Sequence, residues 1–161
     1  YEGMIGMTEN VFINAKNRSH AVTADVTIPK GGANGVILAQ GGRFGGWSLY
    51  LKDGIPTYLY NFLGTNMFKV AATSALPEGK ATIRFEFTYD GGGLGKGGVG
   101  AIFVNGQKVG EGRIDRTQCC IFSADEGADV GEDGETAVST DYLQRNNRFT
   151  GRIHKVTVDL K

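Results

Sequence analysis

Hydrophobic and polar residues alternate along several short stretches of the chain, which is the period of a β-strand with one buried face. The clearest stretch is 82–89, where Ile83, Phe85, Phe87 and Tyr89 share one side of the pleat and polar residues occupy the other. This pattern predicts a half-buried antiparallel strand around which the neighbouring strands are arranged.

A hairpin is predicted immediately downstream. Residues 101–104 are apolar and are followed by Asn105 and Gly106, the dipeptide best suited to a type I′ turn. The chain should therefore turn back into a strand over 107–114. The glycine-rich stretch 90–100 should be a loop that crosses an edge of the fold.

A second hairpin is predicted at Asp53 and Gly54, which separate two alternating runs, 47–52 and 55–62. A two-residue loop there places Trp47 opposite Tyr60 and Leu49 opposite Tyr58, so that the four side chains lie on one face.

The remaining stretches complete an all-β pattern with no amphipathic helix. The further expected strands are 19–28 as an outer strand, 35–40 as a central strand buried on both faces, 67–72, 119–123 and 149–160. About ten to twelve short strands with frequent turn signals predict an antiparallel two-sheet jelly-roll sandwich, as in concanavalin A-like and laminin-G-like domains. We expect one such domain over 19–161, preceded by a lead-in segment, 1–18, packed on its edge.

Composition narrows the function classes. The 161 residues suit one domain, and the 26 glycines suit many turns between short strands. Seventeen basic and seventeen acidic residues give a net charge of zero, so no basic field favours a nucleic-acid or membrane partner. The chain also has no apolar run of the length that spans a membrane as a helix.

Cys119 and Cys120 are the only cysteines, and they are adjacent. A bridge between neighbouring residues needs a strained eight-membered ring, so two separate thiols in a buried strand are expected. Their spacing matches no zinc motif.

Four long runs carry a resemblance to a known family. They are KNRSH at 16–20, AQGGRFGGWSLY at 39–50, RFEFTYDGGG at 84–93 and the segment 122–131. In this order they resemble the C-terminal region of large bacterial arylsulfatases. The wider pattern is similar to laminin-G and concanavalin-like jelly rolls, in which a Tyr-Asp segment precedes a Val-Asn-Gly hairpin.

The resemblance implies a non-catalytic accessory domain of a bacterial protein. It does not distinguish a periplasmic, an extracellular and a cytoplasmic location. In that family the sulfatase reaction belongs to a separate N-terminal domain, whose formylglycine arises from a Cys/Ser-x-Pro-x-Arg motif beside a divalent cation. No such motif occurs in this sequence, so the implied partner is the sulfatase catalytic domain of the parent chain. The resemblance would place an apolar or proline-containing pair at 119–120, so the two cysteines depart from the family pattern.

An aromatic surface is the first candidate binding site. Its members are Arg43, Phe44, Trp47, Tyr58 and Tyr60, which could stack on a sugar ring and pair with a sulfate group. Carbohydrate binding, to sulfated glycans in particular, is therefore the alternative function. The competing interpretation is that the Trp47 face points into the core.

An acidic segment is the second candidate. Asp125, Asp129 and Asp133 could offer oxygen ligands to Ca²⁺ at the rim of the sandwich, although acidic loop residues more commonly face solvent or cap backbone amides.

The sequence gives little indication of a catalytic or nucleotide-binding site. Residues 93–98 match G-x-G-x-x-G, but they join two predicted strands and no helix follows to hold a phosphate. Glu86 and Asp90 are the nearest carboxylates on one strand face, and the spacing typical of jelly-roll glucanases is absent. A glycoside hydrolase would need distant carboxylates to converge.

Overall fold

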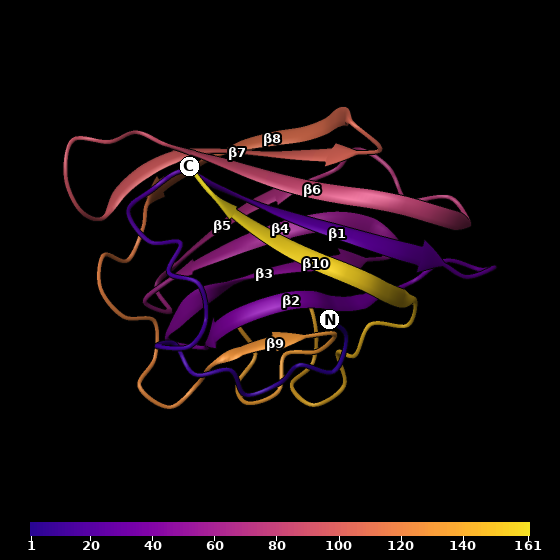
Figure 1. The fold of residues 1–161 in the computed structure, drawn as a ribbon, viewed down its shortest axis with the longest axis horizontal. Coiled ribbons are helices and arrows are strands. Elements are labelled where there is room, and N and C mark those ends of the chain that lie inside the picture. The colour runs from indigo at the N-terminus through magenta and orange to yellow at the C-terminus, as the bar shows by residue number, and fades with distance from the viewer.

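The computed structural model describes all 161 residues as two packed antiparallel sheets of five strands each (Figure 1). The first sheet has the order β10-β1-β6-β7-β8. Its strands are β1 (His20–Ile28), β6 (Gly79–Tyr89), β7 (Lys96–Val104), β8 (Gln107–Arg116) and β10 (Arg152–Leu160). The predicted all-β, two-sheet jelly-roll class is confirmed.

The second sheet has the order β5-β4-β3-β2-β9. Its strands are β2 (Gly35–Gly42), β3 (Gly45–Lys52), β4 (Ile55–Phe62), β5 (Asn66–Ala71) and β9 (Ala128–Val130). The chain has no helix that could cross a lipid bilayer.

Both predicted hairpins form in the expected register. Trp47 pairs with Tyr60 and Leu49 with Tyr58 across β3 and β4. Asn105 and Gly106 connect β7 to β8 with positive φ angles of 50° and 84°, as a type I′ turn requires.

Three local expectations are wrong. Strand β1 is an inner strand, because the C-terminal β10 pairs with its free edge. Strand β7 begins at Lys96, so half of the glycine-rich stretch pairs with β6 and β8 instead of forming a loop. Residues 119–123 form no strand and follow bends and irregular backbone between β8 and β9.

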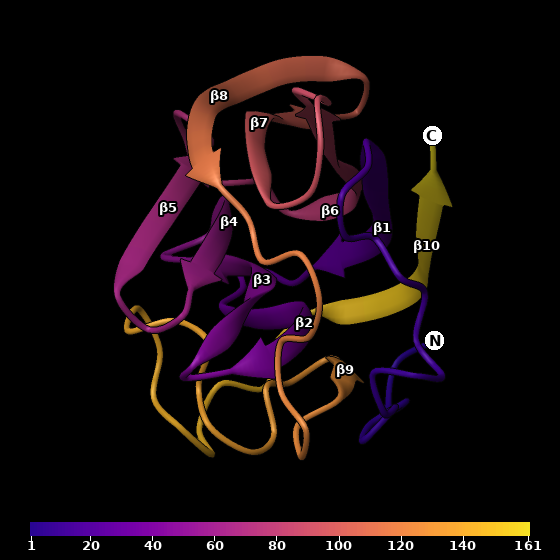
Figure 2. The ribbon, with the colours of Figure 1, turned by 90° about the vertical axis from the view of Figure 1, so that its left-hand side faces the viewer.

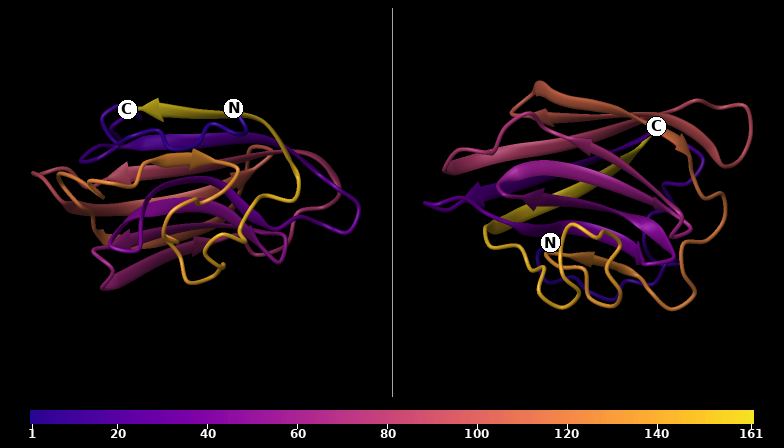
Figure 3. Two further views of the ribbon diagram at one scale, coloured as in Figure 1. Left: turned by 90° about the horizontal axis from the view of Figure 1, so that it is seen from below. Right: turned by 180° about the vertical axis from the view of Figure 1, so that it is seen from behind.

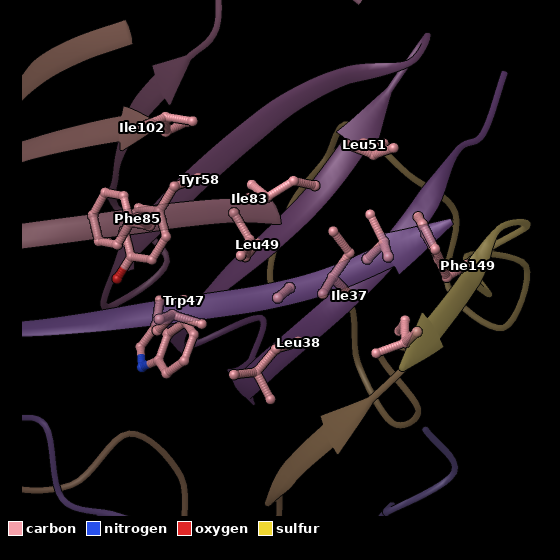
Figure 4. Packing of buried hydrophobic residues seen from close by; sticks show 14 of the residues in the cluster. Ile37, Leu38, Trp47, Leu49, Leu51, Tyr58, Ile83, Phe85, Ile102 and Phe149 are labelled. Carbon is pink, nitrogen blue, oxygen red and sulfur yellow. The ribbon is translucent and has the colours of Figure 1, made fainter. Parts of the chain in front are cut away.

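The main core lies between the two sheets, where the inward faces of both interdigitate (Figure 4). Its centre is aromatic: Tyr58 from β4 lies flat against Phe85 from β6, with ring centroids 3.5 Å apart and planes within 7°. Trp47 from β3 also stacks on Tyr58, with ring centroids 5.8 Å apart. The Tyr58–Phe85 contact joins one sheet to the other.

A smaller core lies on the outer face of the second sheet. Val36, Ala39, Tyr50 and Leu59 pack there against Val138, which belongs to the long connection between β9 and β10. Figure 3 shows this connection looping beside β2 and β3. The strands β2 to β4 are therefore covered on both faces, which explains the unbroken apolar pattern of 35–40.

The N-terminal segment runs along the β9 edge. Met7 exchanges backbone hydrogen bonds with Ala128, at 3.1 and 2.7 Å, and Gly3 donates to the carbonyl of Val130 at 3.2 Å. The segment thus continues the second sheet as an irregular extra edge. The domain boundary at residue 18 stays a prediction.

Candidate functional site

The predicted aromatic surface is divided between core and solvent. Trp47, Tyr58 and Tyr60 are only 2%, 1% and 5% exposed and belong to the main core. Figure 4 shows Trp47 and Tyr58 within it. They therefore form no platform on which a sugar ring could stack. The inward direction follows from the hairpin register, which places all three on the face opposite Tyr50.

The other two predicted residues remain at the surface. Phe44 is 74% exposed in the turn between β2 and β3, and Arg43 beside it is also exposed. Phe44 lies against the next turn, because a Cβ placed on Gly64 would be 3.8 Å from its ring. This end of the sandwich faces the viewer in Figure 2.

A contiguous apolar surface extends from Phe44 across this end. We call it the end surface, and it consists of Phe44, Phe62, Leu63, Leu94, Cys119, Cys120 and Ile121. All but Phe44 line one groove of about 310 Å³. Leu63, Leu94 and Ile121 are 51%, 69% and 56% exposed. Arg116 places its guanidinium 5.4 Å from the ring centre of Phe62.

The floor of the end surface is a disulfide bond between Cys119 and Cys120. The expectation of two separate thiols, which rested on the strain of the ring, is wrong, and so is the buried strand predicted there. In an extended strand adjacent side chains point to opposite faces, whereas the bends in this connection turn both sulfur atoms to one side.

The disulfide loop is held to the second sheet through Gln118. Its backbone N–H donates to the Tyr60 hydroxyl at 2.7 Å, and its side-chain Nε2 donates to the Ile121 carbonyl at 3.0 Å. The side chain fits only because residue 45 is glycine: a Cβ there would be 2.2 Å from the Gln118 oxygen. Gly45 also has a φ of 153°, which disfavours other residues.

The N-terminal segment holds the loop from the other side. Asn17 donates to the Cys119 carbonyl at 2.7 Å and accepts from the Gly95 N–H at 2.8 Å. Glu9 accepts from the Phe122 N–H at 2.9 Å and forms an almost fully buried ion pair with Lys16. The end surface is thus a well-anchored structure.

The predicted calcium residues do not gather into one ligand set. Nowhere in the chain do three or more His, Cys, Asp or Glu side chains form a group that could hold a metal ion. Asp125 is exposed, and Asp129 accepts from the backbone N–H groups of Gly6 and Gly134 at 2.6 and 2.9 Å. Asp129 thus does what acidic loop residues commonly do, which is to cap backbone amides.

Asp133 is buried and organises the covering connection between β9 and β10. Its Oδ2 accepts from the Val138 N–H at 2.8 Å and from the Tyr142 hydroxyl at 2.6 Å. Burial raises the pKa of Asp133 to about 6, because these two hydrogen bonds only partly offset the loss of water. The side chain has a structural role that no sequence motif indicated.

A second groove lies at the opposite end of the sandwich, where β2 begins and β3 ends. We call it the polar groove, and its rim includes Asn34, Lys52, Asp53, Leu143, Asn146 and Arg148. Its volume is about 340 Å³, at the small end of the range for ligand pockets. Sequence analysis missed it because its residues come from three separate segments.

The carboxylates considered for hydrolysis are paired with cations at the surface. Glu86 accepts from Arg84 Nε at 2.8 Å and lies 3.7 Å from Lys161 Nζ, and Asp90 makes a bidentate contact with Arg113. These pairs account for both side chains without a catalytic role.

Comparison with known proteins gives a fold and no family. No family model matches the chain, and no curated protein sequence matches it. Among solved structures, domains LG4-5 of the mouse laminin α1 chain align with a TM-score of 0.63 at 15% identity, covering 96% of this chain and 39% of that chain. The chain thus spans well under half of that laminin structure.

A bacterial structure is similar to the same extent. The CBM40 domain of the Ruminococcus gnavus IT-sialidase, bound to α2,3 sialyllactose, aligns with a TM-score of 0.61 at 13% identity, covering 90% of this chain and 77% of that chain. At these identities the comparison establishes the laminin-G-like sandwich and nothing finer.

Proposed function

We propose that this chain is a non-catalytic accessory domain of a larger protein, and that its end surface docks onto a neighbouring domain. The exposed apolar side chains of the end surface carry this proposal, because soluble domains seldom leave a contiguous patch of this kind uncovered. Aromatic residues and arginine are enriched in protein interfaces, and Phe44, Phe62 and Arg116 supply both.

The neighbouring domain that we propose is a sulfatase. The runs 39–50 and 84–93 resemble the C-terminal region of bacterial arylsulfatases, in which the reaction belongs to a separate domain. Because this chain lacks the Cys/Ser-x-Pro-x-Arg motif, we expect the purified chain to hydrolyse no aryl sulfate. Turnover by the purified chain would contradict the accessory role.

The docking surface is tested by substitutions that remove apolar area without entering the core. Leu94→Ser and Ile121→Ser together should weaken association with the separately expressed remainder of the parent protein by about ten-fold or more. Leu143→Ser, at an exposed apolar residue of the polar groove at the opposite end of the sandwich, is the matched control. Calorimetric titration gives the affinities, and unchanged binding by the double variant would refute docking through this surface.

Saccharide binding is the second candidate function. Arg43 and Phe44 alone make a poor sugar platform, since the three other predicted aromatic residues lie in the core. The polar groove favours this function instead, because amide, carboxylate and cationic groups line one concave site. The fold is also that of a carbohydrate-binding module. Calorimetry against neutral, carboxylated and sulfated saccharides tests it, and no binding to any of them would refute it.

A further inference from the structure

We infer that the polar groove binds an anionic saccharide, with Lys52 and Arg148 holding its carboxylate or sulfate group. This inference rests on the second proposed function and assigns it a site and a ligand class. The groove was not among the surfaces that the sequence indicated, and it is remote from the end surface.

The first argument is the set of hydrogen-bond donors that the protein leaves unused there. Lys52 Nζ has no carboxylate within 4.0 Å, and the side-chain amide nitrogens of Asn34 and Asn146 donate to no protein group. Arg148 Nε lies 3.9 Å from Glu132, beyond hydrogen-bond distance, and its guanidinium is largely exposed. Three donor side chains, those of Lys52, Asn34 and Asn146, therefore line the groove without a protein partner, and Arg148 has only its long ion pair with Glu132.

The second argument concerns the two acidic residues of the same groove, of which Asp141 is paired and Asp53 is free. Asp141 accepts from the Tyr50 hydroxyl at 2.5 Å and lies 2.6 Å from Lys69 Nζ, so its charge is already compensated. Asp53 has no side-chain partner and can accept hydrogen bonds from sugar hydroxyls. A ligand with both hydroxyls and an oxyanion matches this combination better than an anion alone.

The third argument is that the walls of the groove are held in place before any ligand arrives. Asn34 makes three hydrogen bonds to two other segments: its Oδ1 accepts from the Asp53 N–H at 2.6 Å, its N–H donates to the Thr150 hydroxyl at 2.9 Å, and its carbonyl accepts from the Thr150 N–H. Asn147 is buried and donates to the carbonyls of Asp133 and Leu143 at 2.9 and 3.0 Å. Little ordering would be needed on binding, which favours affinity.

One apolar side chain completes the match to a sugar. Leu143 is 68% exposed at the rim, where it can cover the C–H face of a pyranose ring. The groove is balanced in charge overall, so binding should depend on direct contacts with Lys52 and Arg148 more than on a long-range field.

The test uses the intact chain and pairs of saccharides that differ in one charged substituent. Glucuronic acid and N-acetylglucosamine 6-sulfate are compared with glucose and N-acetylglucosamine by NMR titration. We expect at least one anionic sugar to bind about ten-fold more tightly than its neutral partner, with shifts at 34–35, 52–53 and 141–150. Whichever of glucuronic acid and N-acetylglucosamine 6-sulfate binds more tightly shows whether the groove prefers a carboxylate or a sulfate group.

Substitutions then assign the site. Lys52→Gln and Arg148→Gln should each weaken anionic-sugar binding about five- to ten-fold, whereas Lys155→Gln on β10 should leave it unchanged. If anionic sugars bind to all three variants as tightly as to the unsubstituted chain, the assigned site is wrong, although the second proposed function, saccharide binding, is still supported. If neutral sugars bind as tightly as charged ones, the anionic class is wrong. If no saccharide binds, both the inference and the second proposed function fail.

Discussion

The indole Nε1 of Trp47 donates a hydrogen bond to the side-chain oxygen of Gln40 at 3.0 Å, inside the core between the sheets. The two residues are cross-strand partners on β3 and β2, and each is 2% exposed. This contact gives the buried indole its polar partner, so Trp47 serves stability.

Trp47→Ala should therefore lower the free energy of unfolding by about 3 to 5 kcal/mol, the range for removing a large buried aromatic side chain. Phe44→Ala, at an exposed position of the same hairpin, should change it by no more than about 0.5 kcal/mol. Urea unfolding followed by circular dichroism measures both, because Trp47 is the only tryptophan and its replacement removes the fluorescence signal. A Trp47→Ala protein as stable as the unsubstituted chain would show that the indole is not a core residue.

The disulfide of the end surface predicts a thiol count. The native protein should give no free thiol with a chromogenic disulfide reagent, and two after reduction in denaturant. Replacing both cysteines with serine should cost at most about 1 kcal/mol of stability, because the closed loop spans only two residues. Two reactive thiols in protein that was never exposed to reductant would contradict the bridge.

Local pattern accounts for most of the fold. Alternation and turn dipeptides gave the strands and even the register of Trp47 opposite Tyr60, because period and turn type are properties of a few neighbouring residues. The alternation pattern wrongly predicted β1 as an outer strand of its sheet. The strand lies inside the sheet because β10, more than 120 residues later in the chain, pairs with the edge that β6 leaves open. Strand order depends on such distant pairing and leaves little local signal.

The candidate surfaces were harder to predict than the fold. Leu94 and Ile121 lie in loops without periodicity, and only Leu94, which lies between two glycines, carries a local hint of exposure. The polar groove joins residues near 34, 52 and 146, which no motif connects. The disulfide was not predicted because it depends on bends in the backbone. These bends turn the two neighbouring cysteine side chains, which would point to opposite faces of a strand, to the same side.

The buried pair of Glu9 and Lys16 predicts that the N-terminal segment is part of the folded unit. Glu9→Gln should lower stability by about 3 to 5 kcal/mol, because it leaves the Lys16 ammonium buried without a counter-charge. Glu2→Gln, near the start of the same segment, is the matched control. Equal unfolding midpoints for the two variants would mean that residues 1–18 contribute little to the domain.

Asp133 predicts an unusual dependence of stability on pH. Burial raises its pKa in the folded protein to about 6, whereas in the unfolded chain it should be near 3.9. The folded state therefore binds the proton more tightly. This side chain favours folding most below pH 4, and that contribution is lost as the pH rises through 6, to a total of about 3 kcal/mol.

Asp133→Asn removes this titration while keeping an oxygen that can accept from Val138 and Tyr142. The unfolding free energy of the variant minus that of the unsubstituted chain should rise between pH 4 and pH 7. Urea unfolding curves recorded at each pH unit in this range give the two free energies. Burial lowers the pKa of His20, so that residue costs stability as the pH falls, but its effect cancels in the difference. Asp125→Asn, at an exposed loop position, controls for the loss of one charge. A difference for Asp133→Asn that stays flat with pH would show that this carboxyl titrates alike in the folded and unfolded chains.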